Sequence, residues 1–290
     1  MGNEPGKPGD GDPGGDAEGV KMSKTKGNVL DPEELVQEFG ADAVRFTLAA
    51  LDSPGRDIPL NKEQMAGYRA FGNKIWNAAR FALSRVPADA LVLPTIDAAM
   101  LAQLAAPERW ILSRLSYTAQ EVDTQLGLFR FDEACHRLYH FFWGELCDWY
   151  IELAKPALMD PASARPRVGD VLLTVLDRAL RLLHPFMPFL TEEVWQRLPG
   201  RDVVMADRAQ TSICVAPYPQ AEPHWRDLAV ESDLGVLTEV ATRVRSLLTE
   251  SGRERKVGLW TPEPAREAFL ESQSALLATL CRLESLDVRP

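Results

Sequence analysis

The strongest constraint on the fold is a periodic run of apolar residues between Asn61 and Arg85. An α-helix completes one turn in about 3.6 residues, so side chains at steps of three and four share one helix face. The apolar members of this run follow those steps: Met65, Tyr68, Phe71, Ile75, Trp76, Ala79 and Leu83. A helix with such a face must cover it with other elements, which predicts a helical bundle.

Further helices are predicted on both sides of this run. Upstream, Asp31-Pro32-Glu33-Glu34 is typical of a helix start, with an Asp N-cap, an early proline and acids at the positive end of the helix dipole. That helix is expected to end at Gly40, and a second is expected to begin at Asp42 and reach Leu51. Downstream, helical periods recur at 107–127, 131–155 and 168–184, and a short helix is expected through Trp195 to Leu198.

The pattern changes after Pro199. Ser212–Ala216 is typical of a short strand, and helices and strands are then predicted to alternate at 229–250, 256–260, 263–283 and 284–288. The expected fold class is therefore mainly α, a helical bundle with a small C-terminal α+β appendage. We divide the chain into a leader (1–20), a loop with connecting helices (21–60), the bundle (61–200) and the appendage (201–290).

Composition excludes some classes of function. The leader is rich in glycine, proline and acids, has little to bury and is expected to be flexible. The whole chain carries 32 Lys+Arg against 42 Asp+Glu, a net charge of -10, so any polyanion must bind at a local patch. No signal peptide or membrane span is predicted, and four scattered cysteines indicate reduced thiols, so we expect a cytoplasmic protein without a membrane partner.

The segment from Lys21 to Asn28 carries the strongest chemical signal. It contains Lys21, Lys24 and Lys26 around small hydroxyl residues and ends in Gly-Asn. Such a compact cation cluster can surround a polyphosphate and neutralise charge that develops on its oxygens. On these residues alone, an ordinary solvated basic turn before a helix is the favoured interpretation.

The wider context resembles a known family. Lys21-Met22-Ser23-Lys24-Thr25, followed by Gly27-Asn28-Val29-Leu30-Asp31-Pro32 and by residues 39–46, resembles the second signature of class I aminoacyl-tRNA synthetases. Further runs resemble the valyl-tRNA synthetases in particular: 55–58, 67–69, 73–81, 141–150 and 184–189. The resemblance implies a class Ia anticodon-binding bundle and a reaction in which ATP activates valine for transfer to its tRNA.

The resemblance also implies roles for the loop. The lysine that matches Lys24 helps to stabilise the pyrophosphate-side charge during adenylation, so Lys24 is the candidate catalytic residue. Lys21, Met22, Ser23 and Thr25 complete the candidate ATP site, with Thr25 where many members have serine. ATP is the expected substrate, Mg²⁺ is expected with it, and no protein-bound metal is expected.

The sequence departs from the family in one respect. The other class I signature, a His-Ile-Gly-His-type run, is absent from the chain. We therefore expect the catalytic and editing domains before residue 1 and a coiled-coil arm after Pro290, and we do not expect this chain to aminoacylate alone. The expected partners are valine tRNA, ATP and, through the missing domain, valine. The alternatives are a stand-alone tRNA-binding module or paralogue without ligase activity and, third, a purely structural helical scaffold.

Three local patterns leave alternatives open. The aromatic run Phe141, Phe142, Trp143, Trp149 and Tyr150 is typical of a core but also offers stacking faces for unpaired bases. His136 and His140 have the i, i+4 spacing of zinc ligands, yet no third ligand is indicated. Two sets of basic residues are interpreted either as tRNA-backbone contacts or as solvated faces: Arg243, Arg245, Arg253, Arg255 and Lys256, and Arg109, Arg114, Arg130, Arg137, Arg178 and Arg181.

Overall fold

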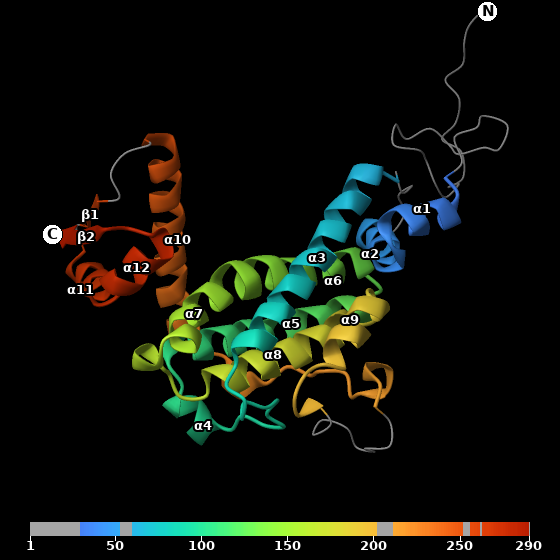
Figure 1. Cartoon of the computed structure of the whole chain (residues 1–290), viewed down its shortest axis with the longest axis horizontal. Coiled ribbons are helices and arrows are strands. Elements are labelled where there is room, and N and C mark those ends of the chain that lie inside the picture. The colour runs from blue at the N-terminus through green and yellow to red at the C-terminus, as the bar shows by residue number, and fades with distance from the viewer. Residues whose placement is uncertain (1–29, 53–59, 202–210, 252–255, 262, 290) are drawn as a thin grey trace, which may run out of the picture.

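A computed structural model describes residues 30–52, 60–201, 211–251, 256–261 and 263–289 of the chain (Figure 1). The predicted leader and the lysine loop lie outside the described residues. Within the described ranges the fold is mainly helical, as predicted, with one two-stranded sheet near the C-terminus.

Two short helices precede the bundle. Helix α1 (Pro32–Phe39) begins as predicted, because the Asp31 carboxylate accepts a hydrogen bond from the Glu33 amide at 2.8 Å. It ends at Gly40, whose φ of 87° favours glycine. Helix α2 (Ala41–Leu51) begins one residue before the predicted start.

The predicted helix is thus confirmed, with Asp42 in its first turn rather than at its first residue. The Asp42 carboxylate accepts hydrogen bonds from the backbone amides of Phe189 and Leu190, at 3.2 and 2.6 Å. These amides lie in the first turn of helix α9 (Pro188–Trp195), where backbone donors have no partner within the helix. Asp42 thus joins α2 to a helix that is distant in sequence.

The bundle is built around helix α8 (Val168–Leu183), most of whose residues are buried (Figure 1). Around it lie the long helix α3 (Lys62–Arg85), α5 (Ala106–Gly127), α6 (Phe131–His140) and α7 (Ile151–Met159). The predicted helices at 61–85, 107–127 and 168–184 are confirmed, and a short helix, α4 (Ala98–Gln103), lies in the connection before α5.

The predicted helix at 131–155 exists but is not uniform. Between α6 and α7 the backbone forms a ten-residue π-helical segment, η1 (Phe141–Tyr150). A π-helix is wider than an α-helix, is rare, and where it occurs is frequently found at functional sites. Three of its aromatic rings, Phe141, Phe142 and Tyr150, are buried, which explains why this segment is held inside the bundle.

The C-terminal part contains a parallel β–α–α–β unit after one long helix. Helix α10 (Leu228–Ser251) leads to strand β1 (Lys256–Trp260), helices α11 (Pro264–Ser272) and α12 (Ser274–Cys281), and strand β2 (Ser285–Arg289). Lys256 pairs with Ser285 and Trp260 with Arg289, which confirms both predicted strands. The single helix predicted at 263–283 is wrong, because the chain breaks at Gln273 between α11 and α12.

The strand predicted at 212–216 is also wrong. Residues Ile213–Val215 form a 3₁₀ turn, η4, and a second 3₁₀ turn, η5, follows at Pro223–Trp225. The Ser212 hydroxyl accepts a hydrogen bond from the Cys214 amide at 3.2 Å, so a local side-chain bond replaces the pairing that a strand needs.

One continuous core joins the bundle to the C-terminal part. Helix α10 packs against α5, and α12 contacts α7, so Leu237 and Ala241 of α10 share the buried cluster that includes Leu112 of α5 and Leu176 of α8. A smaller cluster joins α1, α2 and the start of α3. None of the helices described is long and apolar enough to cross a lipid bilayer.

Candidate nucleic-acid interface

The predicted ATP-loop residues Lys21, Met22, Ser23, Lys24 and Thr25 lie outside the described residues. The structure describes only the helices that follow them. Glu38, near the end of α1, forms an ion pair with Lys62 at 2.7 Å, and its carbonyl oxygen accepts a hydrogen bond from Arg69 at 3.0 Å. The chain that follows the loop is thereby attached to the first turns of α3.

The aromatic run divides into two groups. Phe141, Phe142 and Tyr150 are buried and belong to the core, whereas Trp143 and Trp149 are half-buried. Trp143 stacks on Tyr139 with ring centroids 5.6 Å apart, and the Lys74 ammonium lies 3.8 Å from its ring centroid. Trp149 lies apart from that stack and faces a groove.

The predicted stripe of bundle arginines is not a free cationic surface. Each of the six is paired with a carboxylate: Arg109 with Asp227 (3.0 Å), Arg114 with Glu145 and Glu231 (2.9 Å each), Arg130 with Glu133 (2.7 Å), Arg137 with Glu145 (2.6 Å), Arg178 with Glu222 (3.0 Å) and Arg181 with Asp177 (2.5 Å). Most of these pairs join different elements and are largely buried. Most of them therefore connect segments of the fold, and none of the six is the unpaired cation that the phosphate-contact interpretation assumes.

The groove beside Trp149 lies at the junction of the bundle and the C-terminal part, and we call it the junction groove. Its volume is about 920 Å³. Its walls come from η1 and α7 on one side and from α10 and α12 on the other. Its polar and aromatic lining consists of Asp148, Trp149, Glu152, Lys155, Thr242, Arg245, Thr279 and Arg282.

Arg245 is the best-positioned cation in the junction groove. Its guanidinium donates a hydrogen bond to the Leu280 carbonyl at 2.9 Å and lies 5.1 Å from the Trp149 ring centroid. The two planar groups thus lie together at the junction of α10 with η1. Among the described residues Arg245 makes no ion pair with a carboxylate, in contrast to the bundle arginines.

The other charged groups of the groove are of mixed sign. Lys155 pairs with Glu152, and Lys74 reaches Asp148 from α3 at 2.6 Å. Aromatic and guanidinium planes surrounded by both donors and acceptors suit the face and edge of an unpaired RNA base. A site for phosphate alone would be more uniformly basic.

The groove has no thiol suited to nucleophilic chemistry. Burial is the main cause that raises the pKa of Cys147, to about 12, and burial also raises the pKa of Cys281. A reactive cysteine requires a lowered pKa, because the thiolate is the nucleophile.

The remaining basic and histidine patterns have different outcomes. Of the patch predicted at 243–256, Arg243 is exposed on α10 and Arg245 lies in the groove, while Arg253 and Arg255 lie outside the described residues. His136 and His140 are exposed on α6, and within the described ranges no third ligand accompanies them.

Sequence reasoning identified Trp149 and Arg245 as candidates but missed Lys155 and Arg282. Lys155 lies on α7 and Arg282 directly follows α12. Neither has another basic residue next to it in the sequence, so no local pattern marks either as part of a basic patch. Only the packing of α12 beside α7 brings them to the same groove.

Two sequence families match the chain. The family described as "Anticodon-binding domain of tRNA ligase" matches residues 108–257, just over half of the chain. The family described as "tRNA synthetases class I (I, L, M and V)" matches residues 15–61, which include the lysine loop. The first match contains all of η1, α7 and α10, and hence most of the junction groove.

Curated relatives with these regions are named valine–tRNA ligase. The relative from Geobacter sulfurreducens is 48% identical over 81% of this chain, and the relative from Thermotoga maritima is 40% identical over 93%. These matches cover 26% and 29% of the two relatives, so the chain spans little more than a quarter of their length. The predicted resemblance to the valyl enzymes is confirmed.

A solved structure with a similar fold is the ternary complex of Agrobacterium radiobacter K84 agnB2 LeuRS with tRNA and LeuAMS. The TM-score is 0.54 and the identity 22%, over 74% of this chain and 24% of that one. At this identity the likeness shows the fold alone, which is the predicted class Ia bundle. Together with the family matches, it establishes that the chain belongs to the anticodon-binding domain family of the class I tRNA ligases.

Proposed function

We propose that this chain is the ATP-loop and anticodon-binding region of a valine–tRNA ligase, which joins valine to its tRNA at the expense of ATP. The observation that carries the proposal is the similarity to valine–tRNA ligases along 81–95% of the chain. That similarity includes both the lysine loop and the anticodon-binding bundle. It favours this function over a tRNA-binding module unrelated to aminoacylation.

Within this function, the junction groove is the proposed contact for unpaired anticodon bases. Base stacking on Trp149 and Arg245 and hydrogen bonds from the mixed polar lining are the interactions that single-stranded RNA loops require. The position supports the assignment. The groove lies at the α7–α10–α12 end of the molecule, whereas the segment that follows the ATP loop begins at α1, at the other end (Figure 1). A tRNA likewise has its anticodon and its 3′ end at opposite ends.

The lysine loop is proposed to act in the activation of valine. Lys24 would stabilise the charge that develops on the pyrophosphate side of ATP, and Lys21, Met22, Ser23 and Thr25 would bind the same nucleotide, with Mg²⁺ accompanying it. Cations held in position around a reacting phosphate contribute a large share of the transition-state stabilisation in such catalysis. We propose that the complete enzyme acts in the cytoplasm, because its tRNA and ATP substrates are available there.

Binding of tRNA by the purified chain tests the proposed anticodon-binding function. Filter binding of valine tRNA and of a non-cognate tRNA across a salt series should give tighter binding of valine tRNA at every salt concentration. Affinity should fall as salt rises, since phosphate contacts release counterions. Equal affinity for both tRNAs, or no binding at low salt, would contradict the proposal.

Catalysis by a complete enzyme tests the proposed role of the lysine loop in the activation of valine. A chimera is made in which this chain replaces the matching region of a full-length valine–tRNA ligase, and valine-dependent ATP–pyrophosphate exchange is measured. The chimera should be active, and Lys24→Ala should slow exchange far more than it raises the KM for valine. Lys7→Ala, a lysine outside the loop, serves as the matched control. An inactive but folded chimera would favour the tRNA-binding paralogue.

A further inference from the structure

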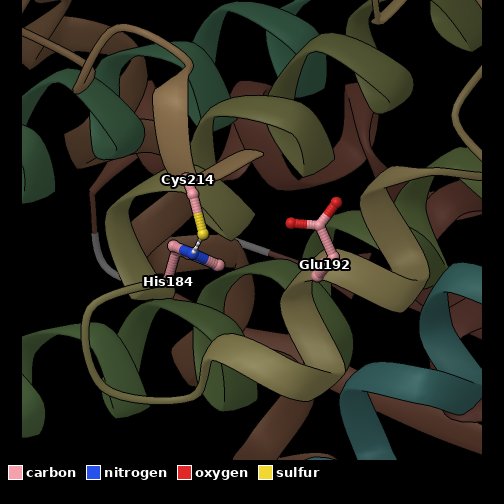
Figure 2. Close-up of side chains that lie close together, drawn as sticks. All are labelled: His184, Glu192 and Cys214. Atoms are coloured by element: carbon pink, nitrogen blue, oxygen red, sulfur yellow. Dashed lines mark hydrogen bonds between the residues drawn. The ribbon is translucent and has the colours of Figure 1, made fainter. Parts of the chain in front are cut away.

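Three side chains from separate segments meet beside the bundle. His184 follows the last turn of α8, Glu192 lies on α9, and Cys214 lies in the η4 turn. The His184 Nε2 atom is 3.1 Å from the Cys214 Sγ atom, and one ligand atom from each of the three residues lies within 4.8 Å of the others. Figure 2 shows the thiol directed at the imidazole ring, with the Glu192 carboxylate beside them.

Hydrogen bonds orient the His184 ring. The Thr191 hydroxyl donates to the Met187 carbonyl at 2.8 Å, so its oxygen is left to accept the bond from His184 Nδ1 at 2.7 Å. The Nδ1 atom therefore carries the proton of the neutral ring, and the lone pair of Nε2 points at Cys214. Histidines that bind metals are typically fixed in this way through the second ring nitrogen.

The Glu192 carboxylate is supported in the same manner. The Ser212 hydroxyl donates to Glu192 Oε2 at 2.8 Å, and the Gln196 amide donates to Oε1 at 2.7 Å. Ser212 also accepts the bond from the Cys214 amide, which attaches the turn that carries the thiol to the carboxylate. Each carboxylate oxygen accepts one bond here and retains a further lone pair for a cation.

We propose that His184, Glu192 and Cys214 form a binding site for a zinc-type divalent cation. A thiolate, an imidazole and a carboxylate are the donor set that zinc takes, and three protein ligands leave a fourth position for water. Zinc bonds of about 2.0–2.3 Å in tetrahedral geometry separate ligand atoms by roughly 3.3–3.7 Å. A bound cation would draw the Glu192 carboxylate and the exposed Cys214 thiol from their present positions to that spacing. The Cys214 thiol releases its proton to solvent as its sulfur binds the metal.

The site would have a structural effect. A bound cation would add a further link between the end of α8, helix α9 and the η4 turn, which already pack together and share hydrogen bonds. Because the cation binds the folded chain, it raises the free energy of unfolding by linkage. The site is separate from the junction groove, with which it shares no residue.

Cobalt(II) provides a probe that reports its own ligands. The full chain is freed of metal with a chelator, reduced, and titrated with Co²⁺. One equivalent should bind, with a thiolate-to-cobalt charge-transfer band and the strong visible bands of a tetrahedral site. Zinc should then displace the cobalt, so that the charge-transfer band and the visible bands both disappear. The melting temperature of the chain should rise with added zinc.

Variants assign the ligands. Cys214→Ser should abolish the charge-transfer band, His184→Gln and Glu192→Gln should each weaken binding at least tenfold, and Thr191→Val should weaken it by about 10–100-fold through loss of the ring orientation. His136→Asn/His140→Asn, the matched control, removes the other histidine pair and should leave the titration unchanged. Circular dichroism checks that each variant folds.

Several results would overturn the proposal. These are the absence of a charge-transfer band in the wild-type chain, retention of the band in Cys214→Ser, and loss of binding in the His136/His140 control. Cys214 is exposed, so its replacement by serine is expected to fold and the test does not depend on a destabilised variant.

Discussion

The arginines of the bundle and the arginine of the junction groove differ in their partners. Arg114, Arg137 and Arg181 are each bound by carboxylates of the same chain, and Arg181 and Asp177 are almost fully buried. Among the described residues Arg245 has no carboxylate partner; its guanidinium donates to the Leu280 carbonyl and lies over an indole ring. In an acidic chain most arginines serve the fold, and a cation is available to RNA only where its carboxylate partner is missing.

The largest expected effect is on a buried pair of the bundle. Glu108 is fully buried and pairs with Arg165 at 2.7 Å, and burial raises its pKa despite that partner. Arg165→Met should lower the free energy of unfolding by about 3–5 kcal/mol at neutral pH, because it leaves a buried carboxylate without a counter-charge. Urea unfolding measures the loss.

The loss of unfolding free energy in Arg165→Met should become smaller as the pH falls. Without Arg165 the pKa of Glu108 rises further above its value in the unfolded chain. The penalty is therefore present where Glu108 is ionised and is lost as the pH falls through the folded pKa and the carboxyl is protonated. The double variant Glu108→Gln/Arg165→Met should be more stable than Arg165→Met at neutral pH. A loss that does not change with pH would contradict this account.

A smaller effect is expected at Arg114. Arg114→Ala leaves Glu145 with Arg137, and Glu231 with Arg226 at 3.4 Å, so neither carboxylate becomes isolated. The free energy of unfolding should fall by about 1.5–3 kcal/mol, the range for hydrogen bonds to charged groups. The affinity of the folded variant for tRNA should not change. A large loss of tRNA affinity would contradict the distinction between the carboxylate-paired arginines of the bundle and Arg245 in the junction groove.

The smallest expected change is in the salt dependence of binding at Arg245. Arg245→Gln should weaken tRNA binding, since the guanidinium plane beside Trp149 is lost. If the plane stacks on a base, the slope of log affinity against log salt should change by well under one unit. Arg243→Gln, on the exposed face of α10, is the matched control. A slope change near one unit would mean that Arg245 binds a phosphate.

Sequence reasoning predicted the helices well because their period follows directly from the geometry of burial. It failed where structure depends on contacts between distant residues. Residues 212–216 were expected to form a strand, but their alternation cannot reveal that the Ser212 side chain bonds the Cys214 amide. The spacing of apolar residues does not distinguish the π-helical segment η1, or the break at Gln273, from a continuous α-helix.

The candidate site was predictable only in part. Trp149 and Arg245 stood out by residue type, and the lysine loop stood out by resemblance, although it lies outside the described residues. That Arg114 is paired was not predictable, because its partner Glu231 comes from α10, far along the chain. The ligands His184, Glu192 and Cys214 converge for the same reason, through the packing of α8, α9 and the η4 turn.

The central claim is that the junction groove contacts the tRNA, and two tryptophans of one segment test it most directly. Trp149 and Trp143 are both half-buried in η1, but only Trp149 lines the groove. Filter binding of valine tRNA is measured for Trp149→Ala and Trp143→Ala at one salt concentration, after both are shown to be folded. Trp149→Ala should weaken binding by about 1–3 kcal/mol, the cost of a lost base stack, and Trp143→Ala should not. Equal affinities of the two variants would contradict the claim.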